Sequence, residues 1–377
     1  MPPQIRRPTY PLAHAARHKP RRIPLVLRFY KGAIHNLIIV PVTLHSLFTV
    51  LVVYLDRNVV SSLGLPPTII PSLSIVVGLM LVFRNQTSYD RFWTGRNCLT
   101  TVGTCVRNLT RSFLVAARPK DDGGTLTDEE MRDTEKVVRV LVAVLYAIKH
   151  NLRAEFNIPP ASLVHFSPQA RDHMSRRPSY SDSPITISRP ASRADSSIEN
   201  GLETAKDEYV SLLPDGLLGF EDQGLGLPLQ LTVLIEGFIR RGFRREWFHG
   251  PQASQLTVQV NTLVDAYGRM ETIRSTPIPV AHLIHQKQVL LLFNCVLPFA
   301  TVDDFGWWAV PIVAIVAFTL YGIEGIGVQL EDPFGYDRND IKMDGIIEDT
   351  RQEVMVLLEE WRAKAQGRSE DLGGMFD

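Results

Sequence analysis

The stretch LVFRNQTSYDRFWTGR, residues Leu81–Arg96, joins an apolar run to a charged one without a break. The run Thr68–Phe83 carries no charge, whereas the residues that follow it include Arg84, Asp90, Arg91 and Arg96. No proline follows Pro71 before Pro119, so nothing in the sequence interrupts a helix across this junction. The stretch therefore predicts one continuous helix that leaves an apolar medium and enters an aqueous one.

Apolar segments suited to membrane helices recur along the chain. They are Ala33–Leu55, Thr68–Phe83, Ile278–Val302 and Trp307–Ile323. The first is long enough to cross a bilayer core, and the third carries a single full charge, Lys287. Tyr54 and the pair Trp307-Trp308 lie at segment ends, where aromatic side chains mark the headgroup region. Four buried core helices are the soluble alternative, but the aromatic positions favour a membrane protein.

The overall composition excludes several classes of protein. The chain has 377 residues, with 40 basic and 40 acidic side chains, so it lacks the basic charge of a nucleic-acid-binding protein. Its three cysteines, Cys98, Cys105 and Cys295, fit neither a disulfide framework nor a spaced metal site. We find no P-loop, nucleophile elbow or zinc-protease motif, so we do not expect an enzyme.

The distribution of basic residues predicts the orientation. The N-terminal arm is rich in Arg and Lys, whereas the short loops hold only Asp56 and Arg57, or Asp303 and Asp304. The positive-inside rule then places both termini in the cytoplasm. The predicted order is an arm over 1–32, transmembrane helices over 33–83, a cytoplasmic helical region over 84–277, transmembrane helices over 278–330, and a cytoplasmic segment over 331–377.

The cytoplasmic region combines helices with one segment of different character. Apolar spacing predicts amphipathic helices over Asp128–Asn151, Leu231–Phe243 and Leu256–Ile273. Residues 167–206 are rich in Ser, Pro and Arg and lack periodicity, which predicts a disordered insert. Within it, Ser179 and Ser192 follow basic motifs typical of basophilic kinase sites, although such motifs also arise by chance in Ser/Arg-rich sequence.

Three apolar residues in the second apolar segment share one helical face. Ile75, Leu79 and Phe83 stand at i, i+4 and i+8. Several copies of this stripe around an axis would form stacked apolar rings, which gate pores by dewetting. For an isolated stripe, however, spacing alone favours ordinary core packing.

Several long motifs resemble the bestrophin family, above all its bacterial and fungal branch. They are FRNQTSYDRFWTGR, FYKGAIHNL at Phe29–Leu37, and the whole of Ile278–Ile341, which includes VLPFATVDDFGWWAVP and LEDPFGYDRND. The match covers both pairs of apolar segments and the sequence after the fourth. The Ser/Arg-rich insert is not matched.

The resemblance implies an all-α membrane protein whose four transmembrane helices continue into a cytoplasmic helical bundle. It further implies a homopentamer in the lipid bilayer that passes chloride or other small monovalent anions through a hydrophobic neck. By position in the family motif, the neck residues are Ile75, Leu79 and Phe83. The family's anion site at the start of this helix, where free backbone N–H groups face the pore, corresponds to Pro71 and Ser72.

The charged residues after the neck have two interpretations. They either line a cytoplasmic vestibule or pair between helices, and pairing is favoured because buried charges in membrane bundles usually have partners. The residues concerned are Arg84, Asp90, Arg91, Arg96, Glu324 and Glu331.

The segment LEDPFGYDRND raises the question of calcium. Animal bestrophins carry an acidic calcium clasp after the Pro-Phe-Gly turn, and Asp337 and Asp340 match it by position. Tyr336, Arg338 and Asn339 depart from that acidic pattern. The resemblance therefore implies no required cofactor, with Asp337 and Asp340 as candidate calcium ligands. The alternative functions are a cation-conducting channel of the same fold and a non-conducting membrane scaffold regulated by phosphorylation of the insert.

Overall fold

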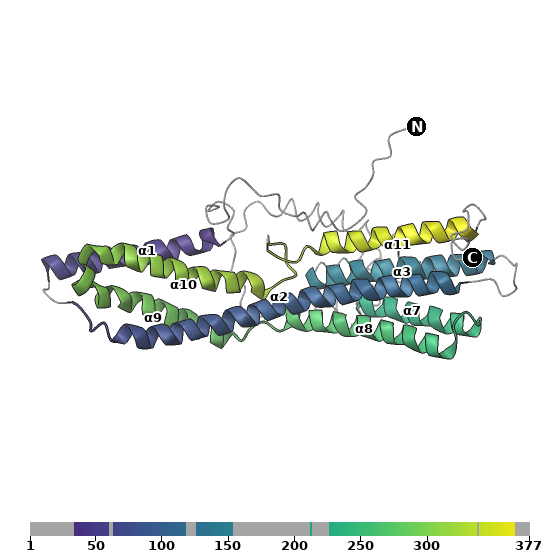
Figure 1. Cartoon of the computed structure of the whole chain (residues 1–377), viewed down its shortest axis with the longest axis horizontal. Coiled ribbons are helices and arrows are strands. Elements are labelled where there is room, and N and C mark those ends of the chain that lie inside the picture. Colours follow the sequence, from purple (N-terminus) through teal and green to yellow (C-terminus); the bar gives the residue numbers. More distant parts are fainter. Residues whose placement is uncertain are drawn as a thin grey trace, which may run out of the picture. The chain divides into compact units, whose positions relative to one another are not determined.

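A computed structural model describes residues 34–59, 63–117, 126–153, 212, 226–337 and 339–365, and every regular element within them is a helix (Figure 1). The predicted all-α class is therefore confirmed for these residues. The N-terminal arm over 1–32, the insert over 167–206 with Ser179 and Ser192, and Arg338 lie outside the described residues.

The helices divide into two compact units. Within the described residues, the first unit lies in the ranges 1–98 and 269–342, and the second lies in 99–268 and 343–377. Two helices, α2 (Ile69–Ala116) and α8 (Gly250–Ser275), run from one unit into the other.

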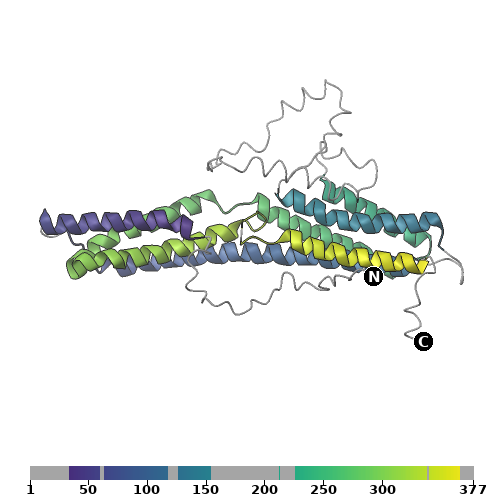
Figure 2. The same ribbon diagram turned by 90° about the horizontal axis from the view of Figure 1, so that it is seen from above.

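The first unit consists of α1 (His35–Asn58), the first part of α2, α9 (Val280–Phe305), the short 3-10 helix η5 (Gly306–Trp308) and α10 (Ala309–Glu331). Helix α1 packs against α9 and α10, as both ribbon views show (Figures 1 and 2). Helix α2 joins them through an apolar cluster formed by Val77, Leu81, Leu290, Phe293, Leu297 and Val313.

The turn between α9 and α10 depends on a glycine. Gly306 ends α9 with φ of +50°, a backbone conformation that side chains with a Cβ rarely adopt. A Cβ at this position would also lie 2.5 Å from Nη2 of Arg57, so that guanidinium would have to move.

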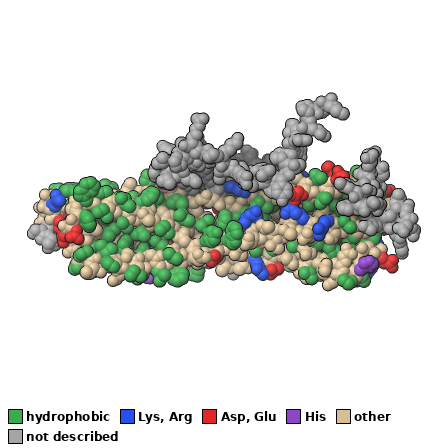
Figure 3. All heavy atoms as spheres, viewed as in Figure 1, with side chains coloured by type: hydrophobic (Ala, Val, Ile, Leu, Met, Phe, Trp, Pro, Cys, Tyr) green, Lys and Arg blue, Asp and Glu red, His purple; other side chains and the backbone are tan. Residues whose placement is uncertain are grey.

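Helices in this unit are long and apolar enough to cross a membrane. By length and composition the described residues contain three such stretches, Leu37–Asn58, Ile69–Ala116 and Val280–Glu331, of which the last contains both α9 and α10. Large apolar side chains on their surfaces are exposed, for example Leu47 and Ile315. Hydrophobic side chains accordingly gather over these helices in the face shown in Figure 3.

The long helix α2 agrees with the continuous helix predicted across Leu81–Arg96. It begins at Ile69 and ends at Ala116, after 48 residues. The sequence between Pro71 and Pro119 contains no proline, so each residue can donate its backbone N–H to the helix. Its buried face in the first unit contains Val77, Leu81, Arg84 and Ser88, at helical spacing and each no more than 3% exposed.

The second unit is built from the rest of α2, with α3 (Asp128–Arg153), α7 (Leu227–Arg244), most of α8 and α11 (Met343–Ala365). Helix α3 packs against α7 and α11. Phe113 of α2 lies at the centre, with its ring 4.8 Å from that of Phe238 and 6.0 Å from that of Phe248.

Local sequence explains the start of α3 at the predicted Asp128. Thr127 and Glu130 form a capping box, in which the Thr127 N–H donates to Glu130 Oε2 (3.1 Å) and the Glu130 N–H donates to Thr127 Oγ1 (3.4 Å). Helix α11, in contrast, was not predicted. Its buried positions do follow a helical period, since Met343, Ile347, Val354 and Leu358 line one face.

Candidate functional site

Three apolar side chains of α2 form an exposed stripe. Ile75, Leu79 and Phe83 are 69%, 54% and 60% exposed in the chain. The stripe lies roughly opposite Val77 and Leu81, which pack into the apolar cluster of the first unit. Core packing within this chain, the alternative that spacing alone favoured, is therefore wrong for these three residues. Their role as a pore neck stays a prediction at this point.

The start of α2 places Pro71 and Ser72 in its exposed first turn. The N–H groups of Ile69 and Ile70 donate to the carbonyls of Pro66 (3.3 Å) and Pro67 (3.2 Å), in the turn that leads into the helix. Pro71 has no N–H, and its carbonyl accepts a hydrogen bond from Ser74 Oγ (2.9 Å). Anion binding at Pro71 and Ser72 is a prediction that these contacts do not test.

The exposed face of α2 changes from apolar to polar directly after Phe83. Gln86, Thr87 and Asp90 are exposed, and Gln86 Nε2 donates to Asp90 Oδ1 at 3.0 Å. Thr87 Oγ1 donates back to the carbonyl of Phe83 at 2.9 Å. The exposed face of the stretch Leu81–Arg96 therefore changes from apolar to polar within one helical turn.

Arg84 lies on the other side of α2, where it is 2% exposed. Its Nε is 3.2 Å from Glu324 Oε2, and its Nη2 donates to Glu331 Oε2 at 3.3 Å. Gln286 of α9 also donates to Glu324 Oε2, at 2.6 Å. A Cβ at Gly327 would be 3.2 Å from Arg84 Nε, so the small residue lets α10 approach the guanidinium. This network joins α2, α9 and α10 inside the first unit.

Arg91 makes a different set of contacts. Its Nε donates to the backbone carbonyl of Glu331 at 2.9 Å, its Nη1 to that of Thr276 at 2.7 Å, and its Nη2 to that of Ile273 at 2.5 Å. Its hydrogen-bond partners are thus backbone carbonyls and not the carboxylates that pairing would have required.

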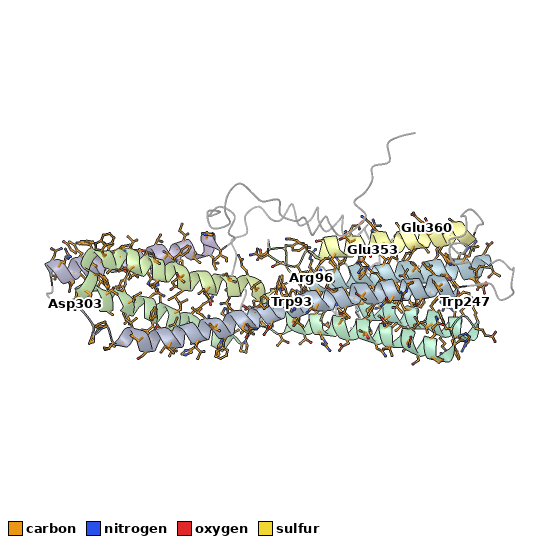
Figure 4. All side chains as sticks on the ribbon, in the orientation of Figure 1. Trp93, Arg96, Trp247, Asp303, Glu353 and Glu360 are labelled. Carbon is orange, nitrogen blue, oxygen red and sulfur yellow. The ribbon has the colours of Figure 1, made fainter. Side chains whose placement is uncertain are left out.

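Two further residues of the predicted set lie on the same helix. Asp90 accepts from Gln86, and Arg96 is half-buried one turn beyond Phe92. Figure 4 labels Arg96 beside Trp93, which is 53% exposed and stacks on Tyr89 with the ring centroids 6.5 Å apart. The structure therefore brings Arg84, Glu324 and Glu331 together, whereas Asp90 faces outward.

The segment after α10 holds Asp337 and Asp340 in one tight turn. Asp340 Oδ2 accepts a hydrogen bond from the Asp337 N–H at 2.6 Å, and Asp340 is 7% exposed. Burial raises the pKa of Asp340, and the hydrogen bond from Asp337 opposes that rise without cancelling it. Within the part of the chain that the structure describes, no group of three His, Cys, Asp or Glu side chains is suited to a metal ion.

Sequence reasoning missed the contacts that hold this segment on α2. Phe334 is 1% exposed, and its ring Cζ would lie 2.8 Å from a Cβ placed on Gly95. The glycine in the motif FWTGR is therefore a point of close approach between α2 and the segment after α10. Gln286 was missed as well, because an amide inside an apolar run carries no sequence signal for its partner.

Comparisons with known proteins agree with this architecture. The family described as Bacterial/Fungal Bestrophin protein matches residues 14–356. A voltage-dependent anion channel-forming protein of Nostoc sp. is 31% identical over 344 residues, which cover 91% of this chain and 93% of the relative. Another of that name, from Synechocystis sp., is 30% identical over 310 residues, with 81% and 82% covered.

A solved structure shares the fold. The crystal structure of a bacterial bestrophin homologue from Klebsiella pneumoniae superposes with a TM-score of 0.62 and 20% sequence identity. The match covers 85% of this chain and 98% of that chain.

Proposed function

Because this chain belongs to the bacterial/fungal bestrophin family, we propose that it is an integral membrane protein that forms an anion channel. Two relatives, each at least 30% identical and covered over most of its length, are named as anion channel-forming proteins. Their names describe channels and not catalysts, which supports a non-enzymatic role. The expected permeant ions are chloride and other small monovalent anions.

The observation that carries the proposal is the exposed stripe on α2. A soluble protein rarely leaves a row of large apolar side chains in water, so Ile75, Leu79 and Phe83 need a partner or a purpose. In a pentamer with α2 nearest the axis, each residue would contribute to one of three stacked apolar rings. Such rings exclude water when the pore is closed and admit ions when it widens.

The remaining helices of the first unit suit a bilayer. We propose four transmembrane helices, formed by α1, the start of α2, α9 and α10, with both termini in the cytoplasm. The exposed apolar side chains of α1 and α10, including Leu47 and Ile315, would then face lipid.

The charges near the neck have separate roles in this proposal. Arg84 and Arg91 are engaged with partners of the first unit, so they hold helices together instead of attracting ions. Anions would instead be stabilised by backbone N–H groups near Pro71 and Ser72. This arrangement needs no ring of fixed positive charge.

One observation favours a second candidate, a cation-conducting channel of the same fold. Asp90 is exposed on the face that follows Phe83 along α2, and its Oδ1 accepts a hydrogen bond from the neutral Gln86. Five such carboxylates in a vestibule would attract cations. Reversal potentials in asymmetric salt distinguish the two candidates, because the reversal potentials of anion-selective and cation-selective channels have opposite signs. If the vestibule sets selectivity, Asp90→Asn moves the reversal potential towards the anion value.

The neck itself is tested by truncation with matched controls. Ile75→Ala, Leu79→Ala and Phe83→Ala are each expected to increase planar-bilayer current, and the triple variant most strongly. Ile315→Ala and Leu44→Ala are matched controls on α10 and α1, with exposures of 66% and 58%. They should leave the current unchanged. Equal currents from neck and control variants would show that α2 does not line the pore.

A further inference from the structure

All three nitrogens of the Arg91 guanidinium donate to backbone carbonyls, and these carbonyls come from two helix ends. Glu331, whose carbonyl accepts from Nε, is the last residue of α10. Ile273 lies in the last turn of α8, and Thr276 follows the end of that helix at Ser275. The ends of two helices that are far apart in the sequence therefore meet at one side chain of α2.

This arrangement satisfies groups that a helix cannot satisfy alone. The last four carbonyls of an α-helix have no partner within the helix, and the C-terminal end carries a partial negative charge. The guanidinium of Arg91 presents its N–H groups in a rigid planar fork, so it can serve both helix ends at once. Backbone carbonyls neither titrate nor rotate away, which makes the contact stiffer than an ion pair between two long side chains.

Glu331 connects this contact to the neck. Its backbone carbonyl is bound by Arg91, and its carboxylate is bound by Arg84, which directly follows Phe83. Arg84 and Arg91 are seven residues apart and therefore lie on one face of α2. The end of α10 is thus attached to α2 at two points about two turns apart, on the face away from the stripe.

We propose that Arg91 is a positioning residue for conduction, which fixes the rotation of α2 by binding the ends of α8 and α10. Successive residues point about 100° apart around a helix, so the direction in which Leu79 and Phe83 point depends on the rotation of α2. A modest rotation of α2 would turn both side chains away from a common axis. This inference rests on the proposed channel function. It assigns Arg91 to the alignment of the neck and not to the attraction of anions.

Two substitutions separate alignment from charge. Arg91→Lys keeps the positive charge, but an ammonium group cannot present the planar fork that reaches all three carbonyls. Arg91→Gln removes the charge and most of the donors. Arg111→Lys, at an exposed position of the same helix, is the control for an Arg-to-Lys change.

The decisive measurement is the open probability of single channels, because each recording reports only on channels that have folded and assembled. Charge-assisted hydrogen bonds shift equilibria by about tenfold or more when they are lost. We therefore expect Arg91→Lys and Arg91→Gln both to change open probability by at least about tenfold, and Arg111→Lys to match the wild type.

Three outcomes would overturn the proposal. Normal gating in Arg91→Lys, with reduced conductance only in Arg91→Gln, would make Arg91 an electrostatic vestibule residue. Normal single channels in both variants with a lower yield would make it a folding residue, as would failure of both variants to assemble.

A second readout keeps the inference separate from the proposed function. Hydrogen exchange of the purified wild type and Arg91→Lys is compared over residues 270–279 and 328–337, which contain the two helix ends. If exchange there is faster in Arg91→Lys and the wild type carries no current, the role of Arg91 at the helix ends is supported and the proposed channel function is contradicted. Unchanged exchange at both ends would reject the positioning role whatever the wild type conducts.

Discussion

Arg84 Nε lies 3.2 Å from Glu324 Oε2, in a pair whose side chains are only 2% and 7% exposed. The pair connects α2 to α10 beside Phe83. Each charge is largely shielded from water, so each depends on the other and on Glu331 and Gln286 for compensation.

Breaking this buried pair should destabilise the protein strongly. Glu324→Gln leaves Arg84 with Glu331 alone, and we expect a loss of about 3 kcal/mol in the free energy of unfolding, the lower end for a broken buried pair. The comparison is Glu353→Gln, which breaks the pair between Arg107 and Glu353 with side chains 40% and 41% exposed. That change should cost about 1 kcal/mol or less. Denaturant unfolding of both variants in the same detergent measures the difference, and equal losses would show that burial of Arg84 has no energetic consequence.

The close approach at Gly95 predicts a steric effect. Gly95→Ala would place a Cβ 2.8 Å from Cζ of Phe334, a ring that is 1% exposed and has little room to move. We expect a loss of about 1–3 kcal/mol, typical of overpacking. Gly78→Ala is the control, because no atom of the chain lies within 4 Å of the added Cβ.

Thermal melting checks both glycine variants together. Gly78→Ala should be neutral or stabilising by roughly 0.5–1 kcal/mol, since alanine favours the helical conformation. A fall in melting temperature at Gly78 alone would contradict the steric assignment and place another molecule against that face.

The start of α11 should lose stability at acidic pH. Burial raises the pKa of Asp344, but the hydrogen bonds and positive charges of Arg153 and Lys149 outweigh burial, so the pKa lies below its usual value. The Arg153 contacts are 3.1 and 2.9 Å, and the Lys149 contact is 3.1 Å. A depressed carboxyl pKa contributes stability that is complete above the unfolded-state pKa and disappears as the pH falls through the folded-state pKa.

Asp344→Asn tests this pH dependence. The side chain is 59% exposed, so its contribution at neutral pH should be roughly 0.5–1 kcal/mol. The difference in melting temperature between wild type and Asp344→Asn should be present at neutral pH and vanish in acid below the usual aspartate range. Glu360→Gln on the same helix, labelled in Figure 4, is the control. A difference that grows as the pH falls would reverse the predicted sign.

Calcium should not be required for conduction. Asp340 is nearly buried and already accepts the Asp337 N–H, so one of its carboxylate oxygens is committed to the turn. A calcium ion usually takes six to eight oxygen ligands, and this turn offers two carboxylates. We expect planar-bilayer current to persist in a calcium chelator. Loss of current on chelation, restored by calcium in the wild type but not in Asp337→Asn, would establish the site that the resemblance suggested.

Much of the secondary structure followed from the sequence. Helix α3 begins at the predicted residue because the capping box and the apolar period agree there. Helix α8 begins at Gly250, six residues before the predicted Leu256. The prediction missed its first turns because they lack a clear apolar period. Helix α11 was overlooked although Ile347, Val354 and Leu358 stand at helical spacing.

The sequence by itself determined which residues of α2 share a face, because the helical period is a local property of the chain. It therefore grouped Ile75, Leu79 and Phe83, and it predicted the continuity of α2. Only the tertiary structure decided which face other helices cover, and it left this stripe exposed. It also decided the partners of Arg91, which lie 182, 185 and 240 residues away along the chain. Contacts over such separations depend on how helices pack, and a backbone carbonyl has no residue identity that a sequence pattern could reveal.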